Sequence, residues 1–183
     1  MDLDILADDL RRVTVQVARR GNVVGAGVVW APEWVVTNAH VIRHRSVEIG
    51  LADGRRAEGL VVAEDREADL ALLRVPHLGI PGAAAAEPGR VRVGSLIVAI
   101  GHPFGMRGVL TRGIVHALGP IIPGGRSWIQ GDLKLGPGNS GGPLADAQGH
   151  LLGLNAMVAG GLALAIPLGE VSRFVDAAGV CPG

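Results

Sequence analysis

Cysteine, tyrosine and lysine are nearly or wholly absent from this chain of 183 residues. The single cysteine, Cys181, has no partner for an internal disulfide and cannot build a zinc cluster alone. Aromatic residues make up only 3% of the chain, and Lys134 is its one lysine. The 17 basic and 17 acidic side chains cancel, which excludes a polyanion-binding protein that depends on net charge.

The chain begins without a recognisable secretory leader, because its first ten residues hold four aspartates and no basic side chain. As it stands the chain would be cytoplasmic, or exported if a leader preceded it. The stretch 151–168 has Asn155 as its only polar side chain, which reaches the length of a membrane span. Gly160-Gly161 and Pro167 interrupt it, so we expect two buried strands joined by a turn and no membrane span.

Glycine is abundant, with 29 residues, and it accompanies 11 prolines and 48% hydrophobic residues. Many turns between short apolar runs favour an all-β fold over a helical bundle. Such runs occur at 13–18, 23–30, 47–51, 60–63, 70–75, 96–100, 109–118, 127–130, 151–158 and 162–166. The segment 76–90, rich in proline and glycine, predicts a surface linker between two groups of strands. Helical spacing is confined to the two ends of the chain.

Three short segments carry candidate chemistry, although each alone is weak. His40 follows an apolar strand in TNAHV, Asp69 precedes another in ADLALL, and Ser140 lies in GNSGGP. A lone residue of each kind is more often an ordinary surface or turn residue. Their order along the chain, however, is that of the chymotrypsin-type triad. We therefore assign Ser140 as nucleophile, His40 as base and Asp69 as the group that orients the imidazole.

The glycines around the serine suit an oxyanion hole, because backbone N–H groups must converge there and glycine permits the backbone conformations required. We assign this role to the backbone of Gly138, Asn139 and Ser140. The pattern G-x-S-x-G also fits the nucleophile elbow of α/β-hydrolases. That fold places its acid and then its histidine after the serine. Here His150 precedes Glu170 and only 43 residues remain, so this alternative fails.

Two further patterns have ordinary interpretations. His40 and His44 are four residues apart, but the glutamate of H-E-x-x-H and a third ligand are missing, so we expect no metal and no other cofactor. The arginine pairs Arg11-Arg12, Arg19-Arg20 and Arg55-Arg56 have acidic residues nearby in the sequence. They are interpreted as solvated surface, without nucleic-acid binding.

Together these motifs resemble the protease domain of the HtrA (Deg) family of trypsin-like serine proteases. The resemblance runs from about Val13 to Ala178 and includes 93–105, 113–119, Gln130 with Asp132, and 165–167. It implies two perpendicular six-stranded antiparallel β-barrels, with the active site between them and short helices at the ends. The expected units of this single protease domain are a first barrel over 12–75, a linker over 76–90, a second barrel over 91–167 and a helix over 168–179.

The chain departs from the family pattern in several places. The family usually carries peptide-binding PDZ modules after the protease domain, whereas this chain stops at Gly183, so regulation through such a module is not expected. Family trimers depend on aromatic side chains near the N-terminus. Because none precedes Trp30, we expect a monomer or weak oligomer instead of a trimer. His102 and Gly136 stand where the family usually has asparagine, which predicts a different loop geometry near the site.

The resemblance implies a serine endopeptidase that hydrolyses unfolded or flexible proteins through an acyl-enzyme, in protein quality control. The alternative is a peptide-binding or chaperone-like module that uses the same cleft with little turnover. The residues expected to bind substrate are Lys134, Leu135, Leu154, Asn155, Ala156, Met157, Ala159 and Leu162. Because the walls 134–138 and 154–162 contain no acid, the pocket should refuse Arg and Lys and accept Val, Ala, Ile or Leu before the cleaved bond. A Lys134 turned inward would instead favour acidic residues.

Overall fold

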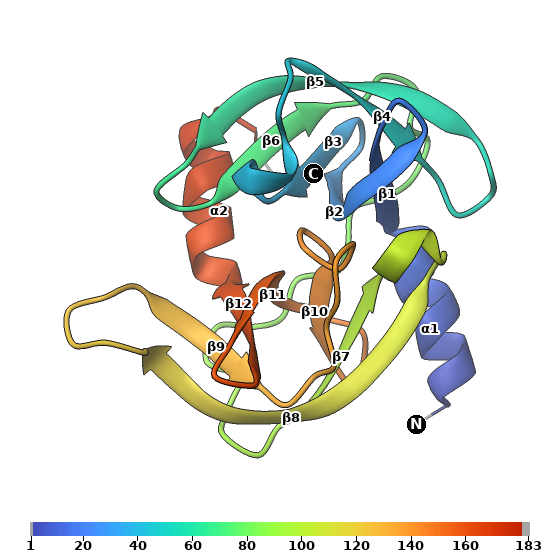
Figure 1. Cartoon of the computed structure of the whole chain (residues 1–183). Helices are drawn as coiled ribbons and strands as arrows, with labels where there is room; N and C mark the ends of the chain where they lie inside the picture. The colour runs from blue at the N-terminus through green and yellow to red at the C-terminus, as the bar shows by residue number, and fades with distance from the viewer. Residues whose placement is uncertain (1, 181–183) are drawn as a thin grey trace.

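Two closed β-barrels, one above the other, form most of the structure, a computed structural model that describes residues 2–180 (Figure 1). The upper barrel holds the first half of the chain, in the strand order β1-β2-β3-β6-β5-β4. Its strands are β1 (Thr14–Arg19), β2 (Asn22–Ala31), β3 (Trp34–Thr37), β4 (Ser46–Gly50), β5 (Arg56–Asp65) and β6 (Leu70–Arg74).

The lower barrel repeats this arrangement with the second half of the chain, in the order β10-β11-β12-β9-β8-β7. Its strands are β7 (Leu96–Gly101), β8 (Val109–Pro120), β9 (Ser127–Gly131), β10 (Pro143–Asp146), β11 (Leu151–Ala159) and β12 (Leu162–Pro167). All neighbouring strands are antiparallel. The expected all-β fold of two six-stranded antiparallel barrels is therefore confirmed.

The strand β6 shows how the sequence builds both a barrel core and the contact between the barrels. Successive side chains of a strand point to opposite faces. Ala71 and Leu73 accordingly lie in the core of the first barrel, whereas Leu70 and Leu72 pack in the apolar cluster between the barrels. A strand buried on both faces needs a continuous apolar run, as LALL provides. Asp69, directly before this run, is thereby placed near the boundary of the two barrels.

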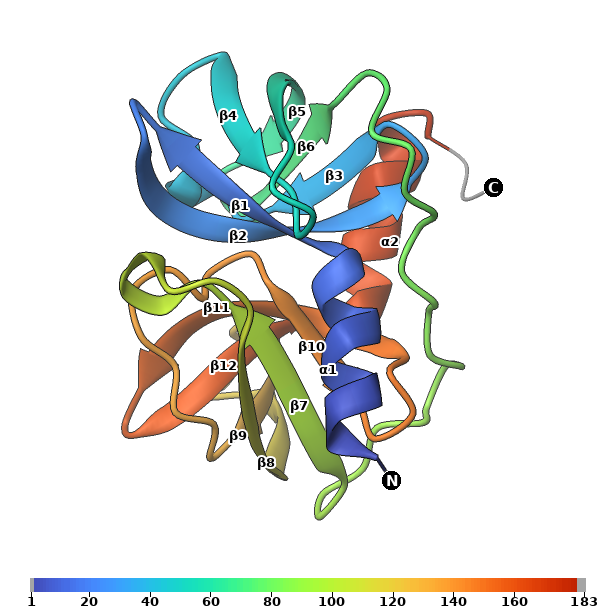
Figure 2. The same ribbon diagram turned by 90° about the vertical axis from the view of Figure 1, so that its right-hand side faces the viewer.

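The helix α1 (Leu3–Arg12) precedes the first barrel but packs on the second (Figure 2). Its buried face contributes Leu6 and Leu10 to a cluster with Val98 and Ile100 of β7. Helical spacing brings these two leucines to one side of the helix. The N-terminal helix is therefore packed against the second barrel, although the first barrel follows it in the chain.

The helix α2 (Leu168–Ala177) follows the second barrel and reaches back toward the first. It contacts β11 and β12 of its own barrel and β6 of the other. Val171 and Val175 are fully buried in the cluster between the barrels. Both helices have ten residues, and no helix within residues 2–180 is long and apolar enough to cross a membrane.

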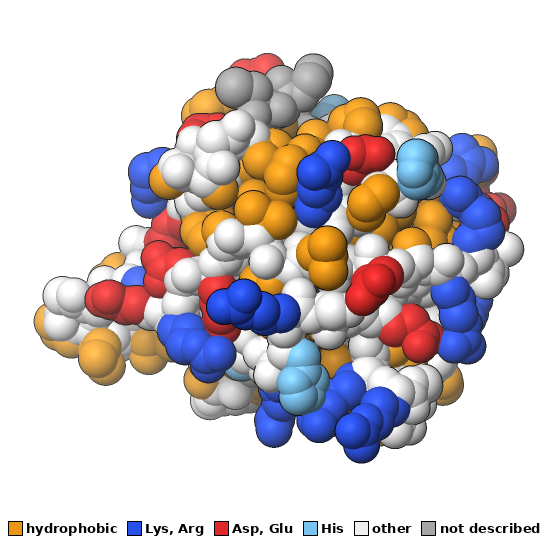
Figure 3. Space-filling model, turned by 90° about the horizontal axis from the view of Figure 1, so that it is seen from above, with side chains coloured by type: hydrophobic (Ala, Val, Ile, Leu, Met, Phe, Trp, Pro, Cys, Tyr) orange, Lys and Arg blue, Asp and Glu red, His pale blue; other side chains and the backbone are white. Residues whose placement is uncertain are grey.

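The segment between β6 and β7 runs along the outside of both barrels, drawn in green in Figure 2. It is tied to each of them, because Ala83 N–H donates to the Val29 carbonyl and Ala86 N–H to the Leu151 carbonyl (2.8 and 3.0 Å). On the face seen in Figure 3, acidic and basic side chains are scattered among apolar ones. This mixture agrees with the formal net charge of zero.

Candidate active site

His40 is positioned by the end of β3. Thr37, the last residue of this strand, donates its hydroxyl to the carbonyl of Ala26 on β2 (2.6 Å). The chain then turns through the short 3₁₀ helix η1 (Ala39–Val41), in which Ala39 and Val41 are buried on either side of His40. These two anchors present the imidazole at the surface, with 49% of the side chain exposed.

Asp69 orients His40 through two hydrogen bonds. Its carboxylate accepts one from the ring Nδ1 (2.8 Å to Oδ2) and one from the backbone N–H of His40 (3.0 Å to Oδ1). Because the nitrogen that faces a carboxylate carries the proton, Nε2 keeps its lone pair and can act as a base. Asp69 has a left-handed φ of 55°, and its carbonyl accepts a hydrogen bond from the amide of the fully buried Asn38 (3.0 Å).

Ser140 belongs to the glycine-rich loop before β10, drawn in orange in Figure 1, which reaches the first barrel. Its carbonyl accepts a hydrogen bond from Ala26 N–H on β2, while Gly141 N–H donates to the Asn155 carbonyl on β11 (both 2.8 Å). Gly141 has a φ of 84°, and a Cβ there would lie 2.2 Å from the Ala26 carbonyl oxygen. Only glycine fits, so the glycine-rich segment is required by the close approach of the two barrels.

The hydroxyl of Ser140 is turned toward β11. It donates to the Ala156 carbonyl (2.9 Å), and no hydrogen bond joins it to His40 in the described part of the chain. A rotation about the Cα–Cβ bond takes a serine hydroxyl from one staggered position to another. The structure therefore brings His40 and Asp69 into direct contact, whereas the hydroxyl of Ser140 is directed to β11.

The peptide between Pro137 and Gly138 has a fixed orientation in the loop before Ser140. The carbonyl of Pro137 accepts a hydrogen bond from Phe104 N–H (3.0 Å). The carbonyl and N–H of one trans peptide point in opposite directions, so Gly138 N–H points away from Phe104. Gly138 has a φ of 104°, and a Cβ there would lie 2.3 Å from the His102 carbonyl oxygen. Any larger residue would displace this peptide.

The three backbone N–H groups assigned to the oxyanion hole are not equivalent. Within residues 2–180, neither Gly138 N–H nor Ser140 N–H donates to another group of the protein. Asn139 N–H, in contrast, donates to the Gly136 carbonyl (3.1 Å). Of the expected set, Asn139 thus has its N–H donor engaged inside the loop, and the oxyanion-hole role of Gly138, Asn139 and Ser140 stays a prediction. The N–H groups of Gly138 and Ser140 remain without a partner in the described residues, and one peptide unit separates them.

His102, which the sequence marked only as a departure from a family pattern, supports this loop. Its backbone N–H donates to the Gly138 carbonyl (3.0 Å), and its ring Nδ1 accepts from Gly108 N–H (3.1 Å). The residue is 5% exposed, and its burial lowers the pKa of His102 from 6.5 to about 4. A neutral imidazole thus lies next to the loop of Gly138 at neutral pH. No sequence motif could have predicted this position.

A hollow of about 340 Å³ opens beside Ser140, between its loop and β11. The residues that line it are Leu135, Gly136, Pro137, Asn139, Ser140, Asn155, Ala156, Met157 and Val158. Four of them, Leu135, Asn155, Ala156 and Met157, were predicted to bind substrate. None of the nine is charged, so apolar side chains and the backbone form most of the surface.

Four other predicted substrate-binding residues do not line this hollow. Leu154 is fully buried in the cluster between the barrels, so its side chain is not available to a substrate. Ala159 and Leu162 pair with each other across the turn between β11 and β12. Lys134 is exposed outside the lining. Within residues 2–180, no three His, Cys, Asp or Glu side chains gather to hold a metal ion.

Comparisons with curated proteins identify relatives among serine proteases. The chain is 37% identical over 163 residues to the "Putative serine protease HhoB" of Synechocystis, an alignment that covers 83% of this chain and 39% of that protein. It is 36% identical over 166 residues to the "Periplasmic serine endoprotease DegP" of Salmonella typhimurium, covering 84% of this chain and 35% of that protein. The chain thus spans well under half the length of these relatives.

Solved structures show the same fold. An "HtrA-type protease AlgW with decapeptide" matches with a TM-score of 0.88 at 24% identity, covering 97% of this chain and 67% of that one. Rv3671c of Mycobacterium tuberculosis, in a form described as inactive, matches with a TM-score of 0.83 at 27% identity, covering 95% and 90%. The sequence profile of the "Trypsin-like peptidase domain" matches residues 25–154. The chain therefore belongs to the family of trypsin-like peptidase domains.

Proposed function

We propose that this chain is a serine endopeptidase of the HtrA type that cleaves unfolded or flexible protein segments. The observation that carries the proposal is the carboxylate of Asp69, which holds both the ring Nδ1 and the backbone N–H of His40 beside the loop of Ser140. Relatives named as serine endoproteases support the same activity. Recognition along a strand edge requires an extended peptide, which folded proteins rarely expose, and this favours flexible segments as substrates.

The catalytic steps follow from the positions of these groups. Ser140 Oγ attacks the substrate carbonyl while His40 Nε2 accepts its proton, and the Asp69 carboxylate stabilises the resulting imidazolium. The negative charge that develops on the carbonyl oxygen is bound by the free N–H groups of Gly138 and Ser140. His40 then gives its proton to the leaving amine, and water hydrolyses the acyl-enzyme. Before attack, the Ser140 hydroxyl must turn away from the Ala156 carbonyl.

The hollow beside Ser140 supports a preference for small or medium apolar residues before the cleaved bond. Leu135, Met157 and Val158 contribute apolar side chains, and no acid lines it. A buried arginine or lysine side chain without a carboxylate partner would be strongly unfavourable. We therefore expect cleavage after Val, Ala, Ile or Leu, as mass-spectrometric mapping of the cut sites in a digested unfolded protein would show. Dominant cuts after Arg or Lys would contradict this pocket assignment.

The central test is the variant Ser140→Ala in a digestion of β-casein, together with labelling by a fluorophosphonate. We expect the rate to fall by roughly three orders of magnitude or more, and labelling to vanish, because a triad acts as a unit. The matched control is Ser127→Ala, which removes an exposed serine hydroxyl that lines neither the hollow nor the loop. Equal far-UV circular dichroism of both variants would show that the fold is intact. Labelling that persists in Ser140→Ala would place the chemistry elsewhere.

The second candidate is a peptide-binding or chaperone-like module, favoured by the contact of Ser140 Oγ with the Ala156 carbonyl instead of His40. Such a module would bind unfolded β-casein with little turnover. Wild-type protein that suppresses the aggregation of an unfolded client, binds no fluorophosphonate and produces no fragments would support this candidate. Fluorophosphonate labelling of Ser140 in the wild-type protein would exclude a permanently inactive serine.

A further inference from the structure

A second hollow, of about 430 Å³, opens on the His40 side of the proposed site. His40 and Gly138 themselves line it, so it adjoins the reacting groups. The end of β1, the first part of β2 and the segment after η1 form its wall on the first barrel. Phe104, whose side chain is largely exposed, forms part of its wall on the second. It is therefore distinct from the hollow beside β11 and lies across the nucleophile loop from it.

The chemistry of the site indicates which part of a substrate enters this second hollow. If the proposed function is correct, His40 gives its proton to the amine that leaves, so the chain after the cleaved bond departs on the His40 side. The residues before the bond occupy the hollow beside β11. The segment that follows the cleaved bond is consequently the one that passes Arg19, Val24 and Arg43.

The strand β2 has a residue without a strand partner beside that segment. The pairing of β1 with β2 passes from Val17–Gly25 to Ala18–Val23, which leaves Val24 as a bulged residue without a partner on β1. Pairing of β2 with β3 begins only at Val28, so Val24 has no strand partner on either side. An extended peptide can add to a stretch of strand that has no partner strand. The hollow therefore suits a peptide main chain as well as side chains.

Two arginines give this hollow a positive charge that no acid neutralises. Arg19 and Arg43 line it together with His44, and no Asp or Glu among the described residues does so. Neither arginine forms an ion pair within residues 2–180. The arginines of the other two sequence pairs, in contrast, all form ion pairs with acids. These pairs are Arg11–Asp8, Arg12–Asp9, Arg55–Asp53 and Arg56–Glu48.

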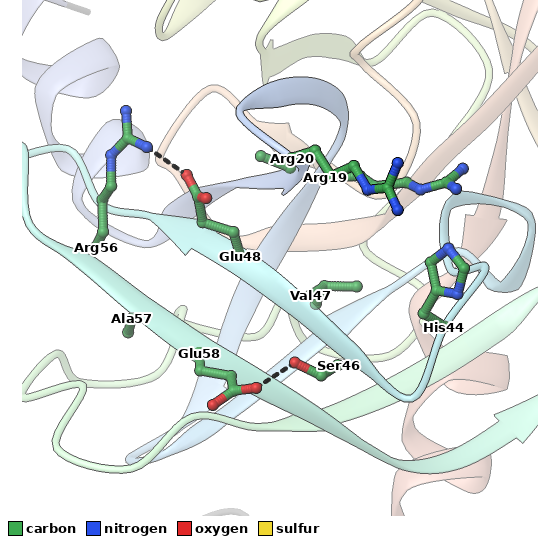
Figure 4. A pocket seen from close by; sticks show the side chains of 10 residues that line it. Arg19, Arg20, His44, Ser46, Val47, Glu48, Arg56, Ala57 and Glu58 are labelled. Atoms are coloured by element: carbon green, nitrogen blue, oxygen red, sulfur yellow. Dashed lines mark hydrogen bonds and ion pairs between the residues drawn. The ribbon is translucent and has the colours of Figure 1, made fainter.

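Arg19 also lines the neighbouring hollow shown in Figure 4, in which Glu48 forms an ion pair with Arg56 and Glu58 forms none in the described part of the chain. Figure 4 shows the guanidinium groups of Arg19 and Arg20 extending toward the side where His44 lies, whereas Glu48 turns toward Arg56. Glu58, on the neighbouring strand β5, accepts a hydrogen bond from the Ser46 hydroxyl. The expectation that Arg19 is simply solvated surface is therefore incomplete, because its charge faces a cavity at the proposed site.

We infer that Arg19 and Arg43 are specificity-determining residues, and that they select substrates with Asp or Glu directly after the cleaved bond. Arginine is suited to carboxylates because its planar guanidinium donates two parallel hydrogen bonds. Each contact is partly exposed to water, so the gain in rate is moderate and decreases as salt is added. The inference rests on the proposed function, since it assigns a direction to the substrate in the same site.

The test compares two internally quenched peptides with Val before the cleaved bond and either Glu-Glu or Gln-Gln after it. We expect kcat/KM to be about fivefold higher for the Glu-Glu peptide at low salt, and the ratio to approach one at high salt. The variant Arg19→Gln/Arg43→Gln should lose this ratio. The control Arg92→Gln/Arg173→Gln removes two exposed charges that line neither hollow and should keep it.

The outcomes separate the inference from the proposed function. Cleavage of both peptides at equal rates, abolished by Ser140→Ala, would leave the protease assignment standing and overturn the role of the arginines. A ratio that survives Arg19→Gln/Arg43→Gln would overturn it as well. If neither the peptides nor β-casein are cleaved, the proposed function fails and the inference fails with it. If β-casein is cleaved but neither peptide is, binding of the fluorescently labelled peptides to Ser140→Ala protein, measured by anisotropy, decides: tighter Glu-Glu binding that needs Arg19 and Arg43 supports the inference, and equal binding overturns it.

Discussion

His102 is a residue whose burial links the oxyanion loop to the stability of the whole protein. Its folded-state pKa of about 4 lies below the value of 6.5 for an unperturbed imidazole, chiefly because it is shielded from water. The unfolded chain therefore takes up a proton at a pH where the folded chain does not. Stability is complete above about pH 6.5 and decreases as the pH falls toward 4, by about 3 kcal/mol for this group.

This pH dependence can be measured by urea denaturation at pH 7 and pH 4. The fall in unfolding free energy between these values should be about 3 kcal/mol smaller in His102→Asn than in the wild-type protein, since carboxylates contribute equally to both. Identical falls in the two proteins would show that burial does not lower the pKa of His102 in the folded state.

The sequence predicts which side chains belong to the proposed site, because their residue types and their order along the chain identify them. It does not predict how a peptide plane or a hydroxyl is oriented there. His40 and Asp69 meet as expected, because a strand end and a strand start fix both. The use of Asn139 N–H inside the loop depends on the orientation of one peptide plane, which no motif encodes. The direction of the Ser140 hydroxyl depends on a single side-chain torsion, which composition and spacing do not determine either.

The helix α1 is an element whose contribution can be isolated. Leu10 is 3% exposed and packs against β7, whereas Ile5 on the same helix is 60% exposed. Leu10→Ala should lower the unfolding free energy by about 3 kcal/mol, through lost burial and a cavity. Ile5→Ala should change it by less than about 0.5 kcal/mol. Urea denaturation of both variants checks this, and equal effects would mean that α1 does not pack on the second barrel.

The strands that the sequence missed share a physical cause. β3 and β10 have four residues each, which is too short for an alternation of period two to be recognised. β5 is longer than the predicted run at 60–63, because its ends are polar and solvent-exposed. The closure of each barrel could not be read from periodicity either. It depends on pairing between distant strands such as β1 and β4, and it was predicted only through the family resemblance.

At the scale of the whole molecule, each half of the chain carries a helix that contacts the barrel of the other half. A break in the linker at Gly89, an exposed position with a φ of 75° and open space around it, would leave these contacts intact. We expect the co-expressed fragments 1–88 and 89–183 to co-purify and to bind a fluorophosphonate only as a pair. Val171→Asp, which puts a charge into the cluster between the barrels, should prevent association. Fragments that do not associate would show that the linker itself holds the barrels together.

The division of the proposed site between the two barrels has a consequence for the order of biosynthesis. His40 and Asp69 are complete when the first barrel leaves the ribosome, but Ser140 comes later and is seated only when its carbonyl meets Ala26 on β2. The walls around it need β11, and the cluster that holds the barrels together needs α2, which follows the second barrel. A nascent chain therefore has no assembled nucleophile until α2 has been made. The order of these parts delays the chemistry until both barrels are complete.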